Sequence, residues 1–324
     1  MHTKSPQTTP ESAPGSAADI KSYDHWTPQV LRHRDLDRMH HVNNVSTIGL
    51  HEDGWARFVE DGRLGGTEDI DWRVDYLGIN FRKELYYRDK VGVGTGVTGS
   101  GGNRLYVGQT LFRDGAPAGY TERIVTPVDR RTGEEIDLPD AAREAARTAR
   151  VEGITPGPFR PTEGAWTSNS ETNAEADYPL WREDIFRFAD LDADEHVGRL
   201  AQLELIESAR VGLIQDVGPP TPDPEHIWLA VHVALNFLSW PGYPGQARTG
   251  TRVRGFGRSS CSVSHTIYSE GRAIATGGAV VAFAHRKTFQ TVEIPGQLRE
   301  RLANAPANNV PSGEKYDPAR VFRD

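Results

Sequence analysis

Apolar and polar residues follow two patterns along this chain, one with helical periodicity and one typical of strands. The same order of patterns occurs twice. Between residues 197 and 217 apolar side chains recur at helical spacing, at Val197, Leu200, Leu203, Ile206, Leu213 and Ile214. Residues 45–59 carry apolar side chains in the corresponding places. Each helical stretch precedes runs rich in Val, Thr, Ile and aromatics, which in the second half span 226–238, 247–255, 261–269 and 272–284. The pattern predicts one long helix and about five strands in each half.

Short polar turns and two prolines complete the layout. Arg113-Asp114-Gly115 and Ser269-Glu270-Gly271-Arg272 are typical of turns that join hairpin strands. A short helix is expected after Pro139 and after Pro295, because proline suits the first turn of a helix. A sheet of this size has one face that can wrap around the long helix. We therefore predict an α+β fold of two tandem units, each a long central helix wrapped by an antiparallel sheet.

The two units are copies of one another. With an offset of 155 residues, eight of the 27 positions from 35 to 61 are identical, whereas chance on ordinary globular composition gives about two. Asp35-Leu36-Asp37 then matches Asp190-Leu191-Asp192. From Trp72, which matches Trp228, the offset becomes 156. An offset sustained over this length indicates a tandem duplication.

Composition separates the units from three looser segments. Residues 1–22 are rich in Ser, Thr, Pro and Ala and are expected to form a disordered tail. Residues 152–180 hold four prolines among acidic side chains, which predicts an extended linker. Residues 308–324 are expected to form a flexible C-terminal tail. This division places an N-terminal unit at 23–151 and a C-terminal unit at 181–307.

Charge and composition exclude several classes of protein. The formal net charge of −8 disfavours non-specific binding to nucleic acid phosphates. The single cysteine, Cys261, rules out an internal disulfide framework and a cysteine-based zinc site. No apolar run approaches the roughly 18 residues that span a membrane, and the first 21 residues lack the apolar stretch of a secretory signal. We expect a cytoplasmic protein with no nucleic acid and no membrane partner.

One segment carries a recognisable motif. Residues 35–44 read Asp-Leu-Asp-Arg-Met-His-His-Val-Asn-Asn. This run resembles the Asp-x-Asp-x-x-Gly-His-Val-Asn-Asn signature of the hotdog-fold acyl thioesterases, the 4-hydroxybenzoyl-CoA and acyl-ACP thioesterase groups. Residues 73–77 and 89–91 are similar to that family's second and third strands. The resemblance implies a double hotdog, in which two sheets join edge to edge, enclose two helices and hold an acyl thioester between the halves.

The chain departs from the family pattern within this motif. His40 stands where the family has glycine. Neither copy contains the whole Asp-x-Asn-x-His motif of the acyl-ACP branch, because the first copy has Met39 where that motif has Asn. In that branch the intact motif lies in the C-terminal unit, whereas here the fuller motif is N-terminal.

Thioester hydrolysis needs one group that polarises the carbonyl and another that activates water. Asn43 and Asn44 lie at the expected start of the long helix, and Asn is a good N-cap. The backbone N–H groups of residues 41–45 are therefore candidate donors to the oxyanion. Asp37 is a candidate general base, or a nucleophile that forms a mixed anhydride. His41 is a candidate for orienting Asp37 or the substrate.

The same acidic residues also fit a purely structural role. Asp35 and Asp37 precede a helix, where carboxylates cap the chain and interact with the helix dipole. The recurrence of Asp-x-Asp with a following His in both copies favours the catalytic role, without deciding which copy works.

The second copy offers an alternative set of catalytic residues, Asp192, Asp194 and His196. There Gly198-Arg199 replaces the Asn pair, and since duplication normally frees one site, we expect one working site per chain. Glu207 lies farther along the second helix, and Glu52 lies at the corresponding point of the first. Their mid-helix positions do not decide whether these side chains face solvent.

Basic residues cluster on a strand of the second unit, at Arg252, Arg254 and Arg258. Arg254 and Arg258 are candidates for binding the phosphates of coenzyme A or of a carrier-protein pantetheine. A solvated strand face is the alternative interpretation. No group of His, Asp and Glu has the spacing of metal ligands, and we predict no metal and no cofactor.

The residues and the resemblance together favour an acyl-thioester hydrolase that cleaves acyl-CoA or acyl-ACP to free acid and thiol. Carboxylate assistance and oxyanion stabilisation at the helix start would supply the catalysis. Two alternatives stay open: a hotdog dehydratase or hydratase, and a non-catalytic protein that binds acyl thioesters. A single hotdog unit needs a second unit to cover its dimer interface, and here the two units of one chain cover each other. We therefore expect a monomeric pseudo-dimer or a homodimer.

Overall fold

The computed structural model describes residues 22–65, 68–149, 151, 159–160, 178–192, 195–217 and 224–305. The helices in these ranges are α1 (Asn44–Glu60), α2 (Asp140–Arg147), α3 (Arg199–Val217) and α4 (Gly296–Ala303). The first unit contributes the strands β1 (His25–Gln29), β2 (Ile70–Phe81), β3 (Val91–Gly101), β4 (Arg104–Arg113) and β5 (Ala116–Asp129). The second contributes β6 (Leu180–Ile185), β7 (His226–Phe237), β8 (Gln246–Phe256), β9 (Ser260–Ser269) and β10 (Arg272–His285).

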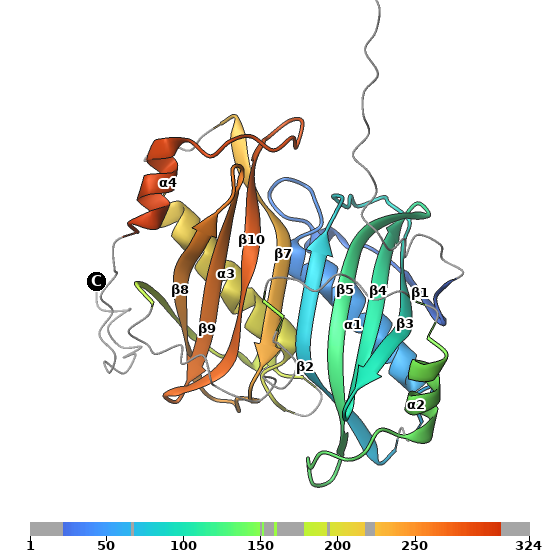
Figure 1. Cartoon of the computed structure of the whole chain (residues 1–324). Coiled ribbons are helices and arrows are strands. Elements are labelled where there is room, and N and C mark those ends of the chain that lie inside the picture. The colour runs from blue at the N-terminus through green and yellow to red at the C-terminus, as the bar shows by residue number, and fades with distance from the viewer. Residues whose placement is uncertain are drawn as a thin grey trace, which may run out of the picture.

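All ten of these strands form one antiparallel sheet in the order β1-β3-β4-β5-β2-β7-β10-β9-β8-β6. The order read outward from the centre is the same in both halves, as a two-fold relation between duplicated units requires (Figure 1). The units join where β2 pairs with β7 over five residue pairs, from Tyr76 with Asn236 to Asn80 with His232. The backbone hydrogen bonding of one unit's sheet therefore continues into the other unit's sheet, and neither β2 nor β7 is an edge strand.

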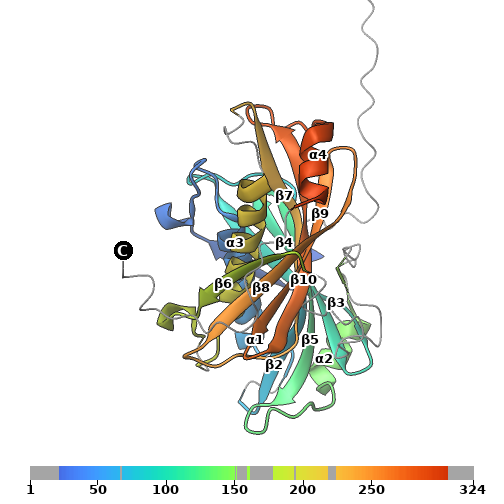
Figure 2. The same cartoon turned by 90° about the vertical axis from the view of Figure 1, so that its left-hand side faces the viewer.

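The two long helices lie side by side on one face of this sheet (Figures 1 and 2). Ile48 and Phe58 of α1 are buried with Ile206 of α3 in a single hydrophobic cluster. Leu77 from β2 and Leu235 from β7 belong to the same cluster. Because burial of apolar area is the main stabilising term in folding, the shared cluster makes the two units one cooperative core.

The loop before each long helix contains one residue in the left-handed backbone region. His40 has φ of 63° in the first unit, and Glu195 has φ of 62° at the equivalent place in the second. Side chains with a Cβ adopt this conformation at a cost, whereas glycine does not. The backbone therefore explains why the resembling signature has glycine where this chain has His40.

Replacing His40 with glycine is expected to stabilise the fold by up to about 1 kcal/mol, because relief of the left-handed strain exceeds the added chain entropy. Urea unfolding at neutral pH measures the change. Met39→Gly is the matched control, since Met39 lacks a positive φ and the substitution there should destabilise by roughly 0.5–1 kcal/mol. Equal destabilisation by both substitutions would show that the loop carries no strain.

Two residues between the units contact the sheet on both sides of the junction. Arg160 Nη1 lies 3.0 Å from Glu122 Oε1 on β5. The ring of Phe159 stacks on His232 of β7 at a centroid distance of 6.1 Å, and the Phe159 carbonyl accepts a hydrogen bond from Asn236 Nδ2 at 3.3 Å. This short segment thereby ties a strand of each unit to the same stretch of chain.

The structure confirms the α+β double hotdog, and within the described ranges each unit has one long helix and five strands. The predicted long helix at 197–217 is α3, and the strand predicted at 226–238 is β7, so the boundaries agree within two residues. The 1–22 tail, apart from residue 22, and the 308–324 tail lie outside the described residues, as does most of the predicted 152–180 linker. In the described part of the chain, no helix is both long and apolar enough to cross a bilayer.

Candidate active site

Asp37 holds the loop that leads into α1. Its Oδ1 accepts hydrogen bonds from the N–H groups of Met39 at 2.7 Å and His41 at 3.1 Å. The N–H of Asp37 donates to the His41 carbonyl at 2.7 Å. One carboxylate oxygen is thus occupied by the backbone, as the structural interpretation expects. The other oxygen accepts no hydrogen bond from the described residues.

The loop of the second unit repeats this arrangement. Asp192 Oδ1 accepts from the N–H of His196 at 3.1 Å, and the N–H of Asp192 donates to the His196 carbonyl at 2.9 Å. Asp194 lies outside the described residues. Because both copies use the second Asp of the Asp-x-Asp motif in this way, the repeated motif itself reflects a shared loop structure.

The start of α1 leaves one backbone donor available. Asn43 is the N-cap, and its side chain accepts from the N–H of Val45 at 2.7 Å. The N–H groups of Val42 and Asn43 donate to the carbonyls of Leu85 and Asp35. Among residues 41–45, the N–H of Asn44 is the one without an acceptor in the described part of the chain. The five candidate oxyanion donors therefore reduce to one, at the positive end of the helix dipole.

A carboxylate of the second unit reaches this helix start. Asn43 Nδ2 lies 3.2 Å from Oε1 and 3.4 Å from Oε2 of Glu207, in the middle of α3. Arg210 lies one turn farther along α3, with Nη2 at 3.5 Å from Glu207 Oε1. The Glu207 side chain is 22% exposed, so it is open to a water molecule. Each long helix thus offers its N-terminus to a glutamate of the other helix.

The start of α3 faces the equivalent glutamate of α1 but is closed by arginines. Arg199, in the place of Asn44, has Nε at 3.0 Å from Glu52 Oε2. Arg123 of β5, which is completely buried, has Nη2 at 2.6 Å from Glu52 Oε1. Burial alone would raise the pKa of Glu52, but Arg123 and Arg199 together lower it to about 2. A carboxylate held in this way is a poor proton acceptor.

His41 is surrounded by aromatic rings from both units. Its ring centroid lies 5.0 Å from that of Tyr86 and 5.3 Å from that of Phe289, which follows β10 in the second unit. His196 is exposed and pairs through its backbone with Gly242, which stands in the place of Tyr86. The two copies therefore differ in the surroundings of the histidine as well as in the residues at the helix start.

Arg254 and Arg258 lie apart from both helix starts. Arg254 is exposed near the end of β8, and Arg258 is exposed in the turn beyond Phe256, where the strand ends, rather than on the strand itself. No hydrogen bond or ion pair of the described residues connects either side chain with α1 or with the start of α3. Their role as phosphate contacts stays a prediction.

The sequence did not reveal that Glu207 contacts Asn43 at the start of α1, nor that Arg123 contacts Glu52 near the start of α3. One signal was present, because glutamate occurs at the same repeat position in both helices. Because α1 and α3 are related by an approximate two-fold axis, the middle of each helix lies near the start of the other. Glu207 and Glu52 therefore do not simply face solvent.

Comparisons with known proteins bear on the fold of the chain and on the family of its first unit. Residues 31–146 match the family model described as the thioesterase-like superfamily. A search of curated proteins finds no match. Among solved structures, the fold is similar to the 12:0-ACP thioesterase from Umbellularia californica, with a TM-score of 0.60, 14% identity, and coverage of 79% of this chain and 93% of that one.

A second solved structure gives the same result. The acyl-ACP thioesterase from Bacteroides thetaiotaomicron is similar with a TM-score of 0.58 and 13% identity, over 79% of this chain and 97% of that one. At these identities the likeness concerns the fold. It extends over both units, so the double arrangement itself is shared.

Proposed function

Residues 31–146 match the family model of the thioesterase-like superfamily, and from that premise we propose that the protein hydrolyses acyl thioesters at the start of α1. The observation that carries the proposal is the hydrogen bond between Asn43 and Glu207. It brings a carboxylate of one unit to the helix start of the other, beside the available N–H of Asn44. The products are a free acid and the thiol of coenzyme A or of a carrier protein.

In the proposed reaction, the carbonyl oxygen of the thioester accepts a hydrogen bond from the Asn44 N–H. The helix dipole favours the negative charge that develops on this oxygen. A water molecule on Glu207 loses a proton to the carboxylate and attacks the carbonyl carbon. The tetrahedral intermediate then expels the thiolate, which takes the proton back from Glu207. No residue of the chain is consumed.

Asp37 and His41 are proposed to support this reaction from the loop. One oxygen of Asp37 holds the loop, which leaves the second to interact with water or substrate. Asp37 therefore stays the alternative base or nucleophile, and its substitution tests that role. His41, between Tyr86 and Phe289, is placed to position an acyl thioester that enters between the units.

We propose one working site per chain. The start of α3 carries the Arg199–Glu52–Arg123 cluster, so its carboxylate is already neutralised and its approach is filled by a side chain. Asp192 and His196 then hold a loop without serving catalysis. Arg254 and Arg258 are proposed to contact phosphates of a coenzyme A substrate.

The test is thiol release from a panel of acyl-CoAs and acyl-carrier-protein thioesters, from short to long and aryl chains. We expect turnover of at least one substrate, a decrease of about 10²-fold in kcat for Asp37→Asn, and little change for Asp192→Asn. A larger effect of Asp192→Asn would place the working site in the second unit. Binding without any turnover would favour the non-catalytic alternative.

Pairing each acyl-CoA with its acyl-pantetheine tests the phosphate contacts in the same assay. A double Arg254→Ala, Arg258→Ala variant should raise KM for the CoA ester and leave the pantetheine ester unchanged. If both esters respond alike, the two arginines form only a solvated strand face.

A further inference from the structure

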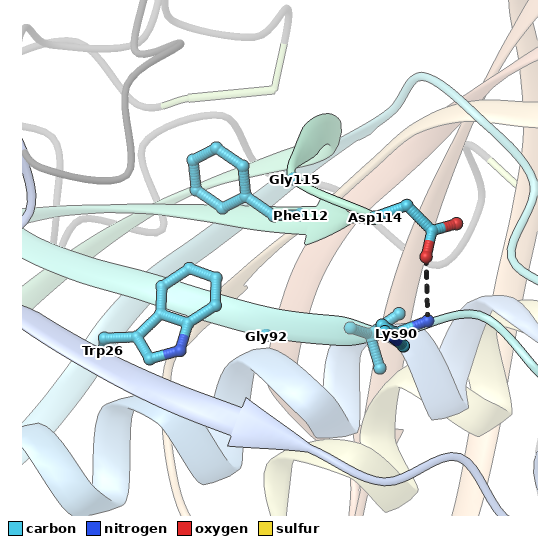
Figure 3. Close-up of a pocket in the computed structure, with 7 residues that line it drawn as sticks. Trp26, Lys90, Gly92, Phe112, Asp114 and Gly115 are labelled. Carbon is cyan, nitrogen blue, oxygen red and sulfur yellow. Dashed lines mark hydrogen bonds between the residues drawn. The ribbon is translucent and has the colours of Figure 1, made fainter.

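Left-handed backbone occurs at five described residues other than glycine, which are His40, Asp114, Glu195, Glu270 and Phe289. Four of them form two equivalent pairs, one before the two long helices and one in two hairpin turns. In the first hairpin turn Asp114 precedes Gly115, and its carboxylate accepts a hydrogen bond from the Lys90 N–H at 3.3 Å (Figure 3). Turns of this kind require positive φ and favour aspartate and glycine. Phe289, with φ of 55°, belongs to neither pair.

The counterpart of Phe289 in the first unit is Gly133, because the two residues close equivalent turns. The Gly133 N–H donates to the carbonyl of Asp129 at 2.7 Å, and the Phe289 N–H donates to the carbonyl of His285 at 2.8 Å. In both turns the side chain of the accepting residue also accepts from the N–H groups two and three positions later. Gly133 has φ of 71°, so both turns place a left-handed residue here. Glycine adopts this backbone freely, whereas phenylalanine does so at a cost.

The ring on this strained backbone contacts the first site. The centroid of the Phe289 ring lies 5.3 Å from that of His41, with the two planes inclined at 57°. Tyr86 contacts the same imidazole from the first unit, at 5.0 Å and 85°. His41 and Phe289 are both half-buried. One aromatic ring from each unit therefore confines the imidazole.

The histidine of the second unit has neither ring beside it. His196 is exposed. The positions equivalent to Tyr86 and Phe289 are both glycine, Gly242 and Gly133. The aromatic pair thus accompanies the helix start that has the accessible glutamate and is missing at the start that arginines close.

We propose that Phe289 is a positioning residue of the first site, whose ring holds the His41 imidazole in the orientation that the thioester requires. The inference rests on the proposed hydrolysis at the start of α1. Backbone strain clusters at active sites, where the surrounding structure maintains it. The strain at Phe289 has this explanation, because the glycine that suits the turn offers no ring to His41.

The first experiment measures thiol release by full-length variants on the thioester that the unaltered chain turns over fastest. Phe289→Gly removes the ring and suits the turn, and it should lower kcat by about 10- to 100-fold. KM should change by less than about twofold, because the ring acts on His41 rather than on the substrate. Phe289→Tyr keeps the ring and should recover most of the kcat. The control is Glu270→Gly, which relieves a φ of 50° in an exposed turn and should leave kcat unchanged.

A double-mutant cycle tests whether Phe289 acts through His41. The variant with both His41→Gln and Phe289→Gly should have the same kcat as His41→Gln alone, within about twofold. Effects that multiply fully would overturn the inference, because Phe289 would then act independently of the imidazole. Unchanged kcat in Phe289→Gly would overturn it as well.

The mobility of the two imidazoles provides a test that needs no turnover. In the full-length chain with ¹³C-labelled histidine rings, NMR relaxation should show a rigid His41 and a more mobile His196, each assigned by its loss in a His→Gln variant. Phe289→Gly should make His41 as mobile as His196, and a His41 ring that stays rigid would contradict the inference. If the unaltered chain cleaves no thioester, the proposed function fails, and the relaxation data still decide whether Phe289 holds His41. If Phe289→Gly does not fold, Phe289→Asn replaces it, because asparagine also tolerates positive φ.

Discussion

Replacing Glu207 with glutamine is expected to lower kcat for thioester hydrolysis by about 10²- to 10⁴-fold, the contribution of a general base. The amide oxygen can still accept the hydrogen bond from Asn43, so the helix start keeps its geometry. What disappears is the capacity to take a proton from water. Stopped-time thiol release measures kcat, and calorimetry with a non-hydrolysable acyl-CoA thioether checks that substrate affinity changes less than about threefold.

Glu204→Gln provides the control for this substitution. Glu204 lies on the same helix one turn earlier, and its pKa is raised by burial and by the nearby Asp190 and Glu207 carboxylates. It makes no contact with the start of α1 among the described residues, so its variant should keep kcat. If Glu207→Gln retained full activity while Asp37→Asn lost it, Asp37 would be the base and Glu207 a structural partner of Asn43.

Replacing Glu52 with glutamine is expected to reduce the free energy of unfolding by about 3–5 kcal/mol, because it leaves Arg123 buried without its counter-charge. Urea unfolding at pH 7 measures the loss. Asp53→Asn is the matched control on the same helix, because Asp53 pairs with Arg57 at the surface, where both side chains are well exposed. An exposed pair of this kind contributes less than about 0.5 kcal/mol.

The difference in the free energy of unfolding between the unaltered chain and Glu52→Gln should also decrease as the pH falls. The pKa of Glu52 in the folded chain is about 2, below its ordinary value of 4.5. The stabilisation is therefore complete above pH 4.5 and is lost as the pH falls toward 2. The gap between the unaltered chain and Glu52→Gln should narrow from pH 5 downward. A gap that stays constant between pH 7 and pH 4 would show that Glu52 is not preferentially charged in the folded state.

Much of the fold was predictable because its signals are local. The apolar stripe at 197–217 has the period of a helix and the run at 226–238 has strand composition, and both properties are set by neighbours in the chain. Asn43 as the N-cap follows from the same short-range rules. The duplication allowed one prediction beyond near neighbours in the chain, namely that the two units have the same arrangement of helix and strands.

The site was predictable only in part. Asp37, His41, Asn43 and Asn44 lie in or next to the loop that leads into α1, and the loop itself occupies one oxygen of Asp37. Asn43 and Glu207 are 164 residues apart, and no periodicity relates them. Their contact depends on how two helices pack across the junction of β2 and β7, which is a property of the assembled sheet.

The sequence by itself predicted one long helix and about five strands in each unit, their repetition, and the motif that leads into each long helix. Only the tertiary structure decided that the two helix starts differ in kind, with Asn43 and an accessible Glu207 at one and Glu52 between Arg123 and Arg199 at the other. The physical reason is that secondary structure follows from interactions between near neighbours. The charge state and accessibility of a carboxylate follow instead from groups brought to it by folding, from any distance along the chain.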